Sequence, residues 1–451
     1  MTVLLAGLLT GGLIASGATP ASARPEKGGT TVTARLAPPV VTLGEPAALV
    51  AQLPAAQQGR PVTVEQYAGG AWTPLGDGAV NAAGRAVVPL DTTAAGDRRL
   101  RVVAEAWNGR PASAPSRAVT LTVVRTDRCT PRTAPVDPDA DPAARCLAAR
   151  LDRWRSAGLM GVGQQLNMSS AQYADPLARL GDRRVSVVGF DLWELGKTRT
   201  YEFPFFDQAF ADLVATARAG AVLTASWHVP NPHTGREYDD RSWHDLGALL
   251  RPSTPEAQAF WAAYDEQLTV LAALQAAGVA VVFRPFHEVN GDWFWWGRPN
   301  ATTFRKVYGQ LQQRAWAAGV HNVLWAYSFA ASSRAGITAP EKLVPTQVDL
   351  AGIDSYYPST GSHRSQAPSM GGYAAVARRV PRMALTEIGP AADTRRTWKA
   401  STVTVTAKAQ SRKPVWALLW VDDAAGYKQI SSLSGGLSWL DSCPFGYCSL
   451  T

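Results

Sequence analysis

The segment 281–297, VVFRPFHEVNGDWFWWG, places charged and aromatic side chains directly after a short apolar run. Val281, Val282 and Phe283 predict a buried strand that delivers Glu288 to a polar cleft walled by aromatic rings. An indole packs against the C–H face of a sugar, whose hydroxyls need charged and amide partners. We therefore expect a sugar site containing a carboxylate. A merely structural Glu288–Arg284 pair is disfavoured, because burying so many polar groups is costly.

Eight short apolar runs alternate with Ala-, Leu- and Arg-rich stretches in the second part of the chain, a pattern typical of parallel β/α proteins. The predicted strands are 160–165, 185–190, 221–226, 280–285, 322–327, 349–354, 382–387 and 415–420. Eight such units over about 300 residues predict an α/β fold, the (β/α)8 TIM barrel.

Side chains suited to chemistry fall at or just after the ends of these predicted strands. They are Glu194, His228, Glu288, Asp354, Tyr356, Glu387, Trp420 and Asp422. In a barrel, the carboxyl ends of all strands converge on one face, where the active site is built. Glu288 follows the fourth strand and Glu387 ends the seventh, so we expect the two carboxylates to face each other across the barrel mouth.

Two opposed carboxylates suit cleavage of a glycosidic bond. One donates a proton to the glycosidic oxygen while the other attacks the anomeric carbon. The carboxyl groups lie about 5–5.5 Å apart in a retaining enzyme, and about 6.5–9.5 Å apart when a water must fit between them.

The run RPFHEVNGDWFWWG over residues 284–297 closely resembles the acid/base signature of glycoside hydrolase family 26, best known for endo-β-1,4-mannanases. The segment Thr386-Glu387-Ile388-Gly389 is similar to the nucleophile strand of that family. Family-like segments also include Gly163-Gln164-Gln165, Gly189-Phe190-Asp191, Ser226-Trp227-His228 and Asp354-Ser355-Tyr356. The resemblance covers most of residues 150–440.

The resemblance implies a role for each matching residue. Glu288 would be the general acid/base, with its pKa raised by a neighbouring ionised Glu387, and Glu387 would be the nucleophile, held by Tyr356. The substrate-binding residues that it implies are His228, Arg284, His287, Asn290, Trp293, Asp354, Tyr356 and Trp420. Trp293 and Trp420 would bracket the sugar that is attacked, while Trp295 would point away from it.

Some of these assignments have structural alternatives. Arg284 can equally be an ion-pair partner, His228 can hold the turn at 230–232, and Glu194 and Asp191 can cap or pair locally. The sequence also departs from some relatives at Val421, where the resemblance implies an arginine that contacts the neighbouring sugar. The family includes enzymes that cut mixed-linkage β-glucan and β-1,3-xylan, so the resemblance does not fix the sugar.

The first 23 residues resemble a secretory signal peptide. An apolar run from Val3 to Ala18 precedes the small-residue site Ala21-Ser22-Ala23, although the usual basic start is missing. A membrane anchor is the alternative, but the run is short for a span. Four cysteines form two sequence-local pairs, 129 with 146 and 443 with 448, which suits disulfides in an exported protein.

Residues 30–125 alternate and turn in the manner of a small β-sandwich, and they resemble a bacterial immunoglobulin-like domain. This part is interpreted as a spacer, with Tyr67, Trp72 and Trp107 as candidates for a sugar platform. A proline-rich linker is expected at 126–145, where no helix is predicted, and a catalytic domain at 146–451. Such a linker would let the two parts fold independently.

The net charge of +8 comes mainly from scattered arginines, which does not favour nucleic-acid binding. The expected protein is a secreted monomer, free of the membrane after signal cleavage, that acts on mannan, glucomannan or galactomannan. Carboxylates alone carry this reaction, so neither a metal nor an organic cofactor is expected. The alternative class is a carbohydrate-binding protein without turnover, and the pair Glu288 and Glu387 argues against it.

Overall fold

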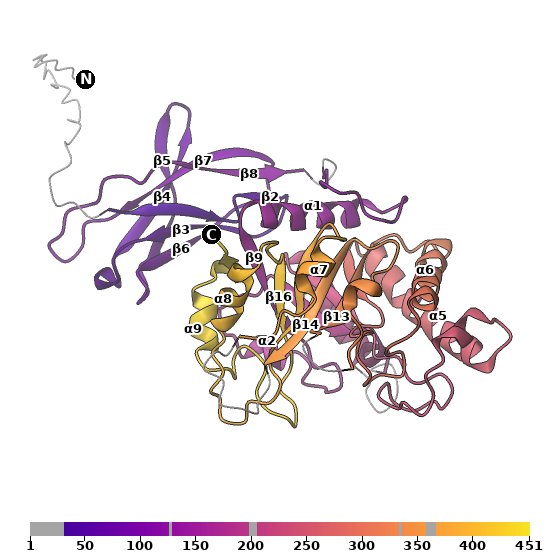
Figure 1. The fold of residues 1–451 in the computed structure, drawn as a ribbon. Coiled ribbons are helices and arrows are strands. Elements are labelled where there is room, and N and C mark those ends of the chain that lie inside the picture. Colours follow the sequence, from indigo (N-terminus) through magenta and orange to yellow (C-terminus); the bar gives the residue numbers. More distant parts are fainter. Residues whose placement is uncertain (1–30, 126–128, 198–204, 333–335, 358–366) are drawn as a thin grey trace, which may run out of the picture.

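The computed structural model describes residues 31–125, 129–197, 205–332, 336–357 and 367–451. Figure 1 shows two all-β layers, coloured indigo to violet, lying against one end of a β/α barrel. The predicted signal peptide, residues 1–23, lies outside the described residues. No helix within the described ranges is both long and apolar enough to cross a bilayer.

The N-terminal part consists of two sheets. One contains β1 (Thr33–Ala37), β3 (Ala47–Gln52) and β6 (Arg85–Leu90), and the other has the order β2 (Val40–Thr42), β8 (Val119–Val124), β7 (Gly96–Ala104), β4 (Pro61–Ala68), β5 (Ala71–Ala79). Alternate residues of both sheets, such as Leu49, Val64 and Val102, meet in one apolar core. This alternation is what a half-buried strand requires.

Eight parallel strands form the barrel, and all eight predicted strands are confirmed. They are β9 (Leu159–Gln165), β10 (Val187–Asp191), β11 (Val222–Ser226), β12 (Val281–Arg284), β13 (Val323–Ala330), β14 (Leu350–Tyr357), β15 (Met383–Pro390) and β16 (Trp416–Leu419). Each pairs with the next, and β16 pairs with β9, which closes the barrel. The short β17 (Tyr447–Ser449) adds to β9 in antiparallel orientation.

Helices surround the barrel. They are α2 (Asp175–Ala178), α3 (Leu192–Lys197), α4 (Phe206–Arg218), α5 (Pro255–Ala276), α6 (Ala301–Ala317), α7 (Tyr373–Ala377), α8 (Thr402–Ala409) and α9 (Gly436–Asp441). Short 3-10 turns are η1 (Ala55–Gln57), η3 (Leu246–Leu250), η4 (Pro340–Lys342) and η5 (Pro444–Gly446). The connections at the carboxyl ends of the strands carry the side chains of the site.

Helix α1 (Pro142–Ser156) covers the opposite end of the barrel. Its Leu147, Leu151 and Trp154 pack with residues from the beginnings of the strands, such as Val187 and Val282. Apolar side chains therefore fill the end of the barrel at which the strands begin, as expected of a packed TIM barrel.

The start of α1 corrects the predicted linker. Residues 142–145 form the first turn of the helix, so the expectation that no helix occurs before residue 146 is wrong. Proline is favourable at the first helical position, because its missing N–H has no intrahelical partner there. Asp141 caps the turn by accepting a hydrogen bond from the Ala144 amide at 2.6 Å.

The described part of the proline-rich segment is anchored to the barrel. The Val136 amide donates to Asp349, and the His321 ring lies 2.9 Å from the Asp137 carboxylate. The Cys129–Cys146 disulfide joins the segment to α1, and a second disulfide joins Cys443 to Cys448. Both predicted pairings are confirmed.

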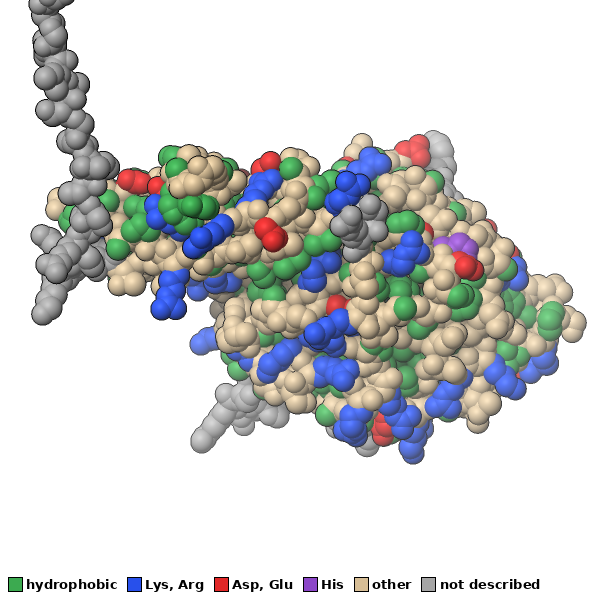
Figure 2. Space-filling view, turned by 90° about the horizontal axis from the view of Figure 1, so that it is seen from above, with side chains coloured by type: hydrophobic (Ala, Val, Ile, Leu, Met, Phe, Trp, Pro, Cys, Tyr) green, Lys and Arg blue, Asp and Glu red, His purple; other side chains and the backbone are tan. Residues whose placement is uncertain are grey.

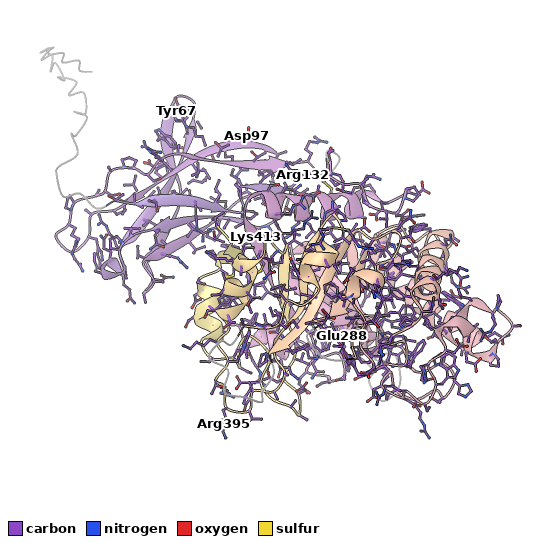
Figure 3. The ribbon with its side chains drawn as sticks, viewed as in Figure 1. Tyr67, Asp97, Arg132, Glu288, Arg395 and Lys413 are labelled. Atoms are coloured by element: carbon purple, nitrogen blue, oxygen red, sulfur yellow. A yellow bond between two sulfur atoms is a disulfide. The ribbon has the colours of Figure 1, made fainter. Side chains whose placement is uncertain are left out.

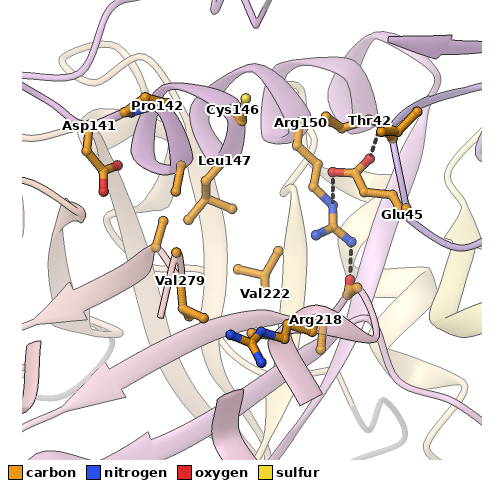
Figure 4. A pocket seen from close by; sticks show the side chains of 18 of the residues that line it. Thr42, Glu45, Asp141, Pro142, Cys146, Leu147, Arg150, Arg218, Val222 and Val279 are labelled. Atoms are coloured by element: carbon orange, nitrogen blue, oxygen red, sulfur yellow. Dashed lines mark hydrogen bonds and ion pairs between the residues drawn. The ribbon is translucent and has the colours of Figure 1, made fainter. Parts of the chain in front are cut away.

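A buried ion pair connects the N-terminal sheets to α1. Glu45, in the turn after β2, lies 3.2 Å from Arg150 and 3.5 Å from Arg153. Arg153 also donates to the Thr42 hydroxyl, and Arg150 donates to the carbonyl of Gly220. Figure 4 shows Glu45 reaching Arg150 at the edge of a 560 Å³ cavity between this turn, α1 and the barrel. The two parts are thus joined by charge as well as by the chain.

We expect Glu45→Gln to lower the free energy of unfolding by about 2 kcal/mol, because it leaves two largely buried guanidinium groups without their carboxylate. Denaturant unfolding of the full chain measures the change. The matched control is Glu237→Gln, whose exposed pair with Lys197 should contribute less than about 0.5 kcal/mol. Equal effects of the two substitutions would show that the Glu45 contact does not hold the parts together.

Candidate active site

The turn after β12 holds Glu288 in an unusual backbone conformation. Phe286 and Glu288 have φ angles of +52° and +55°, a region that side chains other than glycine rarely adopt. The backbone amide of Glu288 donates to the Ser328 carbonyl of β13 at 3.1 Å, which helps to fix the turn. Such strain is typical of functional sites, where the surrounding structure enforces it.

Gly291 explains part of the motif that follows. A β-carbon at this position would lie 2.3 Å from the ring of Trp293, so only glycine lets the indole fold back over the turn. In that position the indole N–H of Trp293 donates to the Glu288 carboxylate. The spacing of glutamate, glycine and tryptophan thereby positions one hydrogen-bond donor on one carboxylate.

Glu387 lies in β15 and is held from two sides. The Arg284 guanidinium, at the end of β12, donates to one of its carboxylate oxygens at 3.0 Å. The Tyr356 hydroxyl, from β14, donates to the other at 2.7 Å. Both oxygens therefore have a partner that favours the negative charge.

A third carboxylate, Asp354, lies beside this pair. It accepts a hydrogen bond from the Ser328 hydroxyl at 2.7 Å and lies 3.5 Å from Arg284. One oxygen each of Glu288, Asp354 and Glu387 lie within 4.8 Å of one another. The two glutamates thus face each other at the barrel mouth, as the strand positions predicted.

This crowding changes the protonation of the site. Burial raises the pKa of Glu288 well above its usual value, and the charges of Asp354 and Glu387 raise it further. Burial and the neighbouring Glu387 raise the pKa of Asp354 to about 7, although Arg284 opposes the shift. The sequence predicted the direction for Glu288 but named Glu387 as the cause, whereas burial is the larger one.

Oxygen-rich clusters of this kind can bind a divalent cation. Among the described residues, Glu288, Asp354 and Glu387 are the acidic group with suitable spacing. Arg284 already supplies a positive charge to two of the three. The three carboxylates are therefore partly compensated by one buried guanidinium.

A hydrogen-bonded chain of two histidines lies next to the carboxylates. His228, after β11, has its Nδ1 atom 2.8 Å from Asp191, and its Nε2 atom 3.1 Å from Nε2 of His287. Burial would lower the pKa of His228, but the Asp191 carboxylate, together with Glu194 and Glu387, outweighs it and raises the pKa. Burial and the positive neighbours His228 and Arg284 lower the pKa of His287. A proton is thus favoured on His228.

The sequence matches the model of one known protein family. The model of glycosyl hydrolase family 26 matches residues 136–436, more than half of the sequence. The chain belongs to this family. The match begins in the proline-rich segment that is anchored to the barrel, ten residues before the predicted start of the catalytic domain.

Two curated relatives carry the same activity in their names. The mannan endo-1,4-β-mannosidase A and B of Caldalkalibacillus mannanilyticus is 29% identical over 47% of this chain and 42% of its own length. The mannan endo-1,4-β-mannosidase of Bacillus subtilis strain 168 is 28% identical over 40% of this chain and 50% of its own. The chain therefore spans half or less of the length of these two relatives.

Two solved mannanase structures share the fold of the barrel. The Bacillus subtilis mannanase man26 superimposes with a TM-score of 0.57 at 21% identity, over 70% of this chain and 95% of that one. A double mutant of the Cellulomonas fimi endo-β-1,4-mannanase gives 0.54 at 23% identity, over 69% and 76%. At these identities the likeness establishes the fold.

Four residues expected to contact substrate lie behind the surface of the site. Arg284, His287, Asn290 and Asp354 are at most 2% exposed. Asn290 exchanges two hydrogen bonds of 2.8 Å with the backbone of Ala330 in β13, which leaves its amide no free orientation. Neighbouring strands supply the partners of these side chains, which favours a positioning role for them. Direct contact of these four with a sugar stays a prediction.

The remaining predicted residues border the barrel mouth. Trp293, Tyr356 and Trp420 are partly exposed, and the Trp420 ring lies 6.1 Å from His228. Trp295 is fully buried and donates to the Val229 carbonyl, so it points away from the site as expected. His228 is 8% exposed, but both its ring nitrogens have partners, so contact with a sugar through Nε2 requires release from His287.

Three further polar residues border the site: the sequence offered Asp191 and Glu194 only as local caps or pairing partners, and it did not single out Ser328. Asp191 caps α3 by accepting from the Trp193 and Glu194 amides, and its other oxygen holds His228. Glu194 is partly exposed, and burial together with Asp191 raises its pKa to about 7. Ser328 links Arg284 to Asp354. The signal for Ser328 was a single hydroxyl within the apolar run of β13.

We expect Asp191→Asn to lower the pKa of His228, because the substitution removes the negative charge that stabilises the protonated ring. An NMR titration of the histidine ring resonances measures the shift. Asp265→Asn, which removes a charge from an exposed pair with Arg314, should leave the His228 titration unchanged. A His228 midpoint that stays constant in Asp191→Asn would contradict the role given to Asp191.

Proposed function

We propose that the protein is a secreted, retaining endo-β-1,4-mannanase that acts on mannan, glucomannan or galactomannan. The observation that carries the proposal is that the two facing glutamates have different hydrogen-bond partners and different neighbouring charges. Glu387 is paired with Arg284 and Tyr356, while Glu288 is partly buried beside negative charges that raise its pKa. One is thus suited to attack as an anion, and the other to carry a proton.

In the first step, a Glu387 oxygen bonds to the anomeric carbon of the bound sugar. The bond between that carbon and the glycosidic oxygen breaks, and the proton of Glu288 moves to this oxygen. The leaving chain departs as an alcohol, and a covalent glycosyl ester remains on Glu387. The separation of carboxylate oxygens within 4.8 Å favours this direct attack over one by an interposed water.

In the second step, Glu288 accepts a proton from a water molecule that attacks the same carbon. The ester bond to Glu387 breaks and the carboxylate returns to its pairing with Arg284 and Tyr356. Two inversions at the anomeric carbon restore the β-configuration. Trp293 and Trp420 would pack against the sugar ring, and the indole N–H of Trp293 would stabilise Glu288 each time it becomes an anion.

The proposed domain organisation follows the sequence. An immunoglobulin-like sandwich at 30–125 precedes the barrel, which carries the full set of proposed catalytic groups. A signal peptide at 1–23 would direct secretion, and the two disulfides fit an oxidising destination. Names of relatives support mannan as the substrate.

The deciding experiment compares hydrolysis of galactomannan, mixed-linkage β-glucan and β-1,3-xylan. Glu288→Ala and Glu387→Ala should each reduce turnover of the preferred polymer by about 10²- to 10⁴-fold or more, because each removes a group needed for a chemical step. On an activated aryl glycoside, whose leaving group needs little protonation, Glu288→Ala should retain its first step and Glu387→Ala should not.

Glu237→Ala, an exposed glutamate in the loop after β11, is the matched control and should retain activity on every substrate. Equal and complete loss with both site variants on the aryl glycoside would mean that the two roles are misassigned. Absence of hydrolysis on the whole panel, with a folded wild-type protein, would favour a binding protein instead.

The stereochemistry of the first product provides an independent test. A double displacement through Glu387 should release the β-anomer, and proton NMR of freshly cleaved oligosaccharide detects it before mutarotation. Initial release of the α-anomer would exclude Glu387 as nucleophile and make it a base that activates water.

A further inference from the structure

The outer face of the five-stranded N-terminal sheet carries two aromatic rings side by side. Tyr67 in β4 and Trp72 in β5 are directly paired across the strands, with ring centroids 5.3 Å apart. Tyr67 is 41% exposed, although a large aromatic side chain on a sheet normally packs inward. Trp107, the third aromatic candidate from the sequence, is not paired with them in this sheet.

Charged groups surround these rings in a balanced arrangement. Arg99 lies 5.6 Å from the Tyr67 ring and 5.7 Å from the Trp72 ring, and Arg101 lies 4.3 Å from Trp72. Arg101 is paired with Glu65 at 2.6 Å. Arg99 is exposed, and it has no carboxylate within ion-pair distance in the described parts of the chain. Its N–H groups are therefore available to an external acceptor.

The face points away from the barrel. Its outward residues alternate with the buried Val64, Leu100 and Val102, which face the second sheet. Figure 2 looks onto this side of the molecule and shows basic, acidic and apolar side chains mixed over the sheet. In Figure 3, Tyr67 lies at the far end of the molecule from Glu288. A ligand on this face would thus be separate from the catalytic site.

We infer that Tyr67, Trp72 and Arg99 form a glycan-binding platform for a single soluble chain of neutral β-linked hexoses. Two rings with a neighbouring guanidinium offer packing for C–H faces and donors for hydroxyl oxygens, the combination that sugars require. The rings are tilted by 57°, which suits a twisted single chain and not the flat face of a crystalline polymer. Glu65 and the nearby Asp97 offset the two arginines, which disfavours an anionic polymer.

This inference rests on the proposed function for its choice of glycan. A platform remote from the catalytic site would act as an anchor that raises the local concentration of polymer. It would not change the cleavage of an oligosaccharide too short to reach it.

The test uses the full chain with Glu288→Gln and Glu387→Gln, which prevents digestion, in native gels containing soluble glucomannan. Adding Trp72→Ala should weaken the affinity on the order of tenfold, as expected for the loss of one aromatic stacking partner. Tyr67→Ala provides a second variant, and thermal unfolding verifies that each protein is folded. Leu75→Ala removes an exposed apolar side chain from the same strand and should leave retardation unchanged.

Two outcomes would overturn the inference, and a third would overturn only the proposed activity. One is unchanged retardation in folded Trp72→Ala and Tyr67→Ala, which would leave the pair as a stabiliser of the hairpin. Another is stronger retardation by polygalacturonate than by glucomannan, which would point to an anionic ligand. Loss of hydrolysis in the wild-type chain, with retardation that still depends on Trp72, would refute the proposed activity alone.

Discussion

A single buried guanidinium offsets the repulsion among the three carboxylates at the barrel mouth. Arg284 is fully buried, and it lies within ion-pair distance of Asp354 and Glu387 and bonds to the Ser328 hydroxyl. These partners come from β14, β15 and β13, while Arg284 itself ends β12. One side chain therefore connects four consecutive strands. Without it, three neighbouring carboxylates in a low-dielectric site would repel one another and take up protons.

The difference between the two glutamates follows from this placement. Arg284 contacts Glu387 directly. Glu288 stands on a turn that projects beyond the strand end, and among the described residues its carboxylate accepts from the indole N–H of Trp293. Two identical side chains are thus given different surroundings by the ends of two strands. The buried layer that includes Asn290, His287 and Asp191 holds these surroundings in place, since most of its polar atoms are bound to backbone or to each other.

The sequence predicted the barrel and the positions of the two glutamates, because both depend on local patterns. Apolar runs mark strands, and the residue after each run lies at the carboxyl end. The burial of individual polar side chains was harder to predict from the sequence. Asn290 is buried because Ala330, forty residues later, bonds to its amide. The start of α1 was missed because proline was interpreted as a helix breaker, whereas Pro142 occupies the position where helices accept it.

The backbone conformation at Glu288 lowers folding stability, in conflict with the catalytic role proposed for this residue. A φ angle of +55° is comfortable for glycine and costs other residues about 1 kcal/mol or more. Selection for thermal resistance alone would therefore favour glycine at this position, at the expense of the proposed proton donor. Improvements in heat tolerance must instead come from positions away from this turn, such as the junction between α1 and the N-terminal sheets.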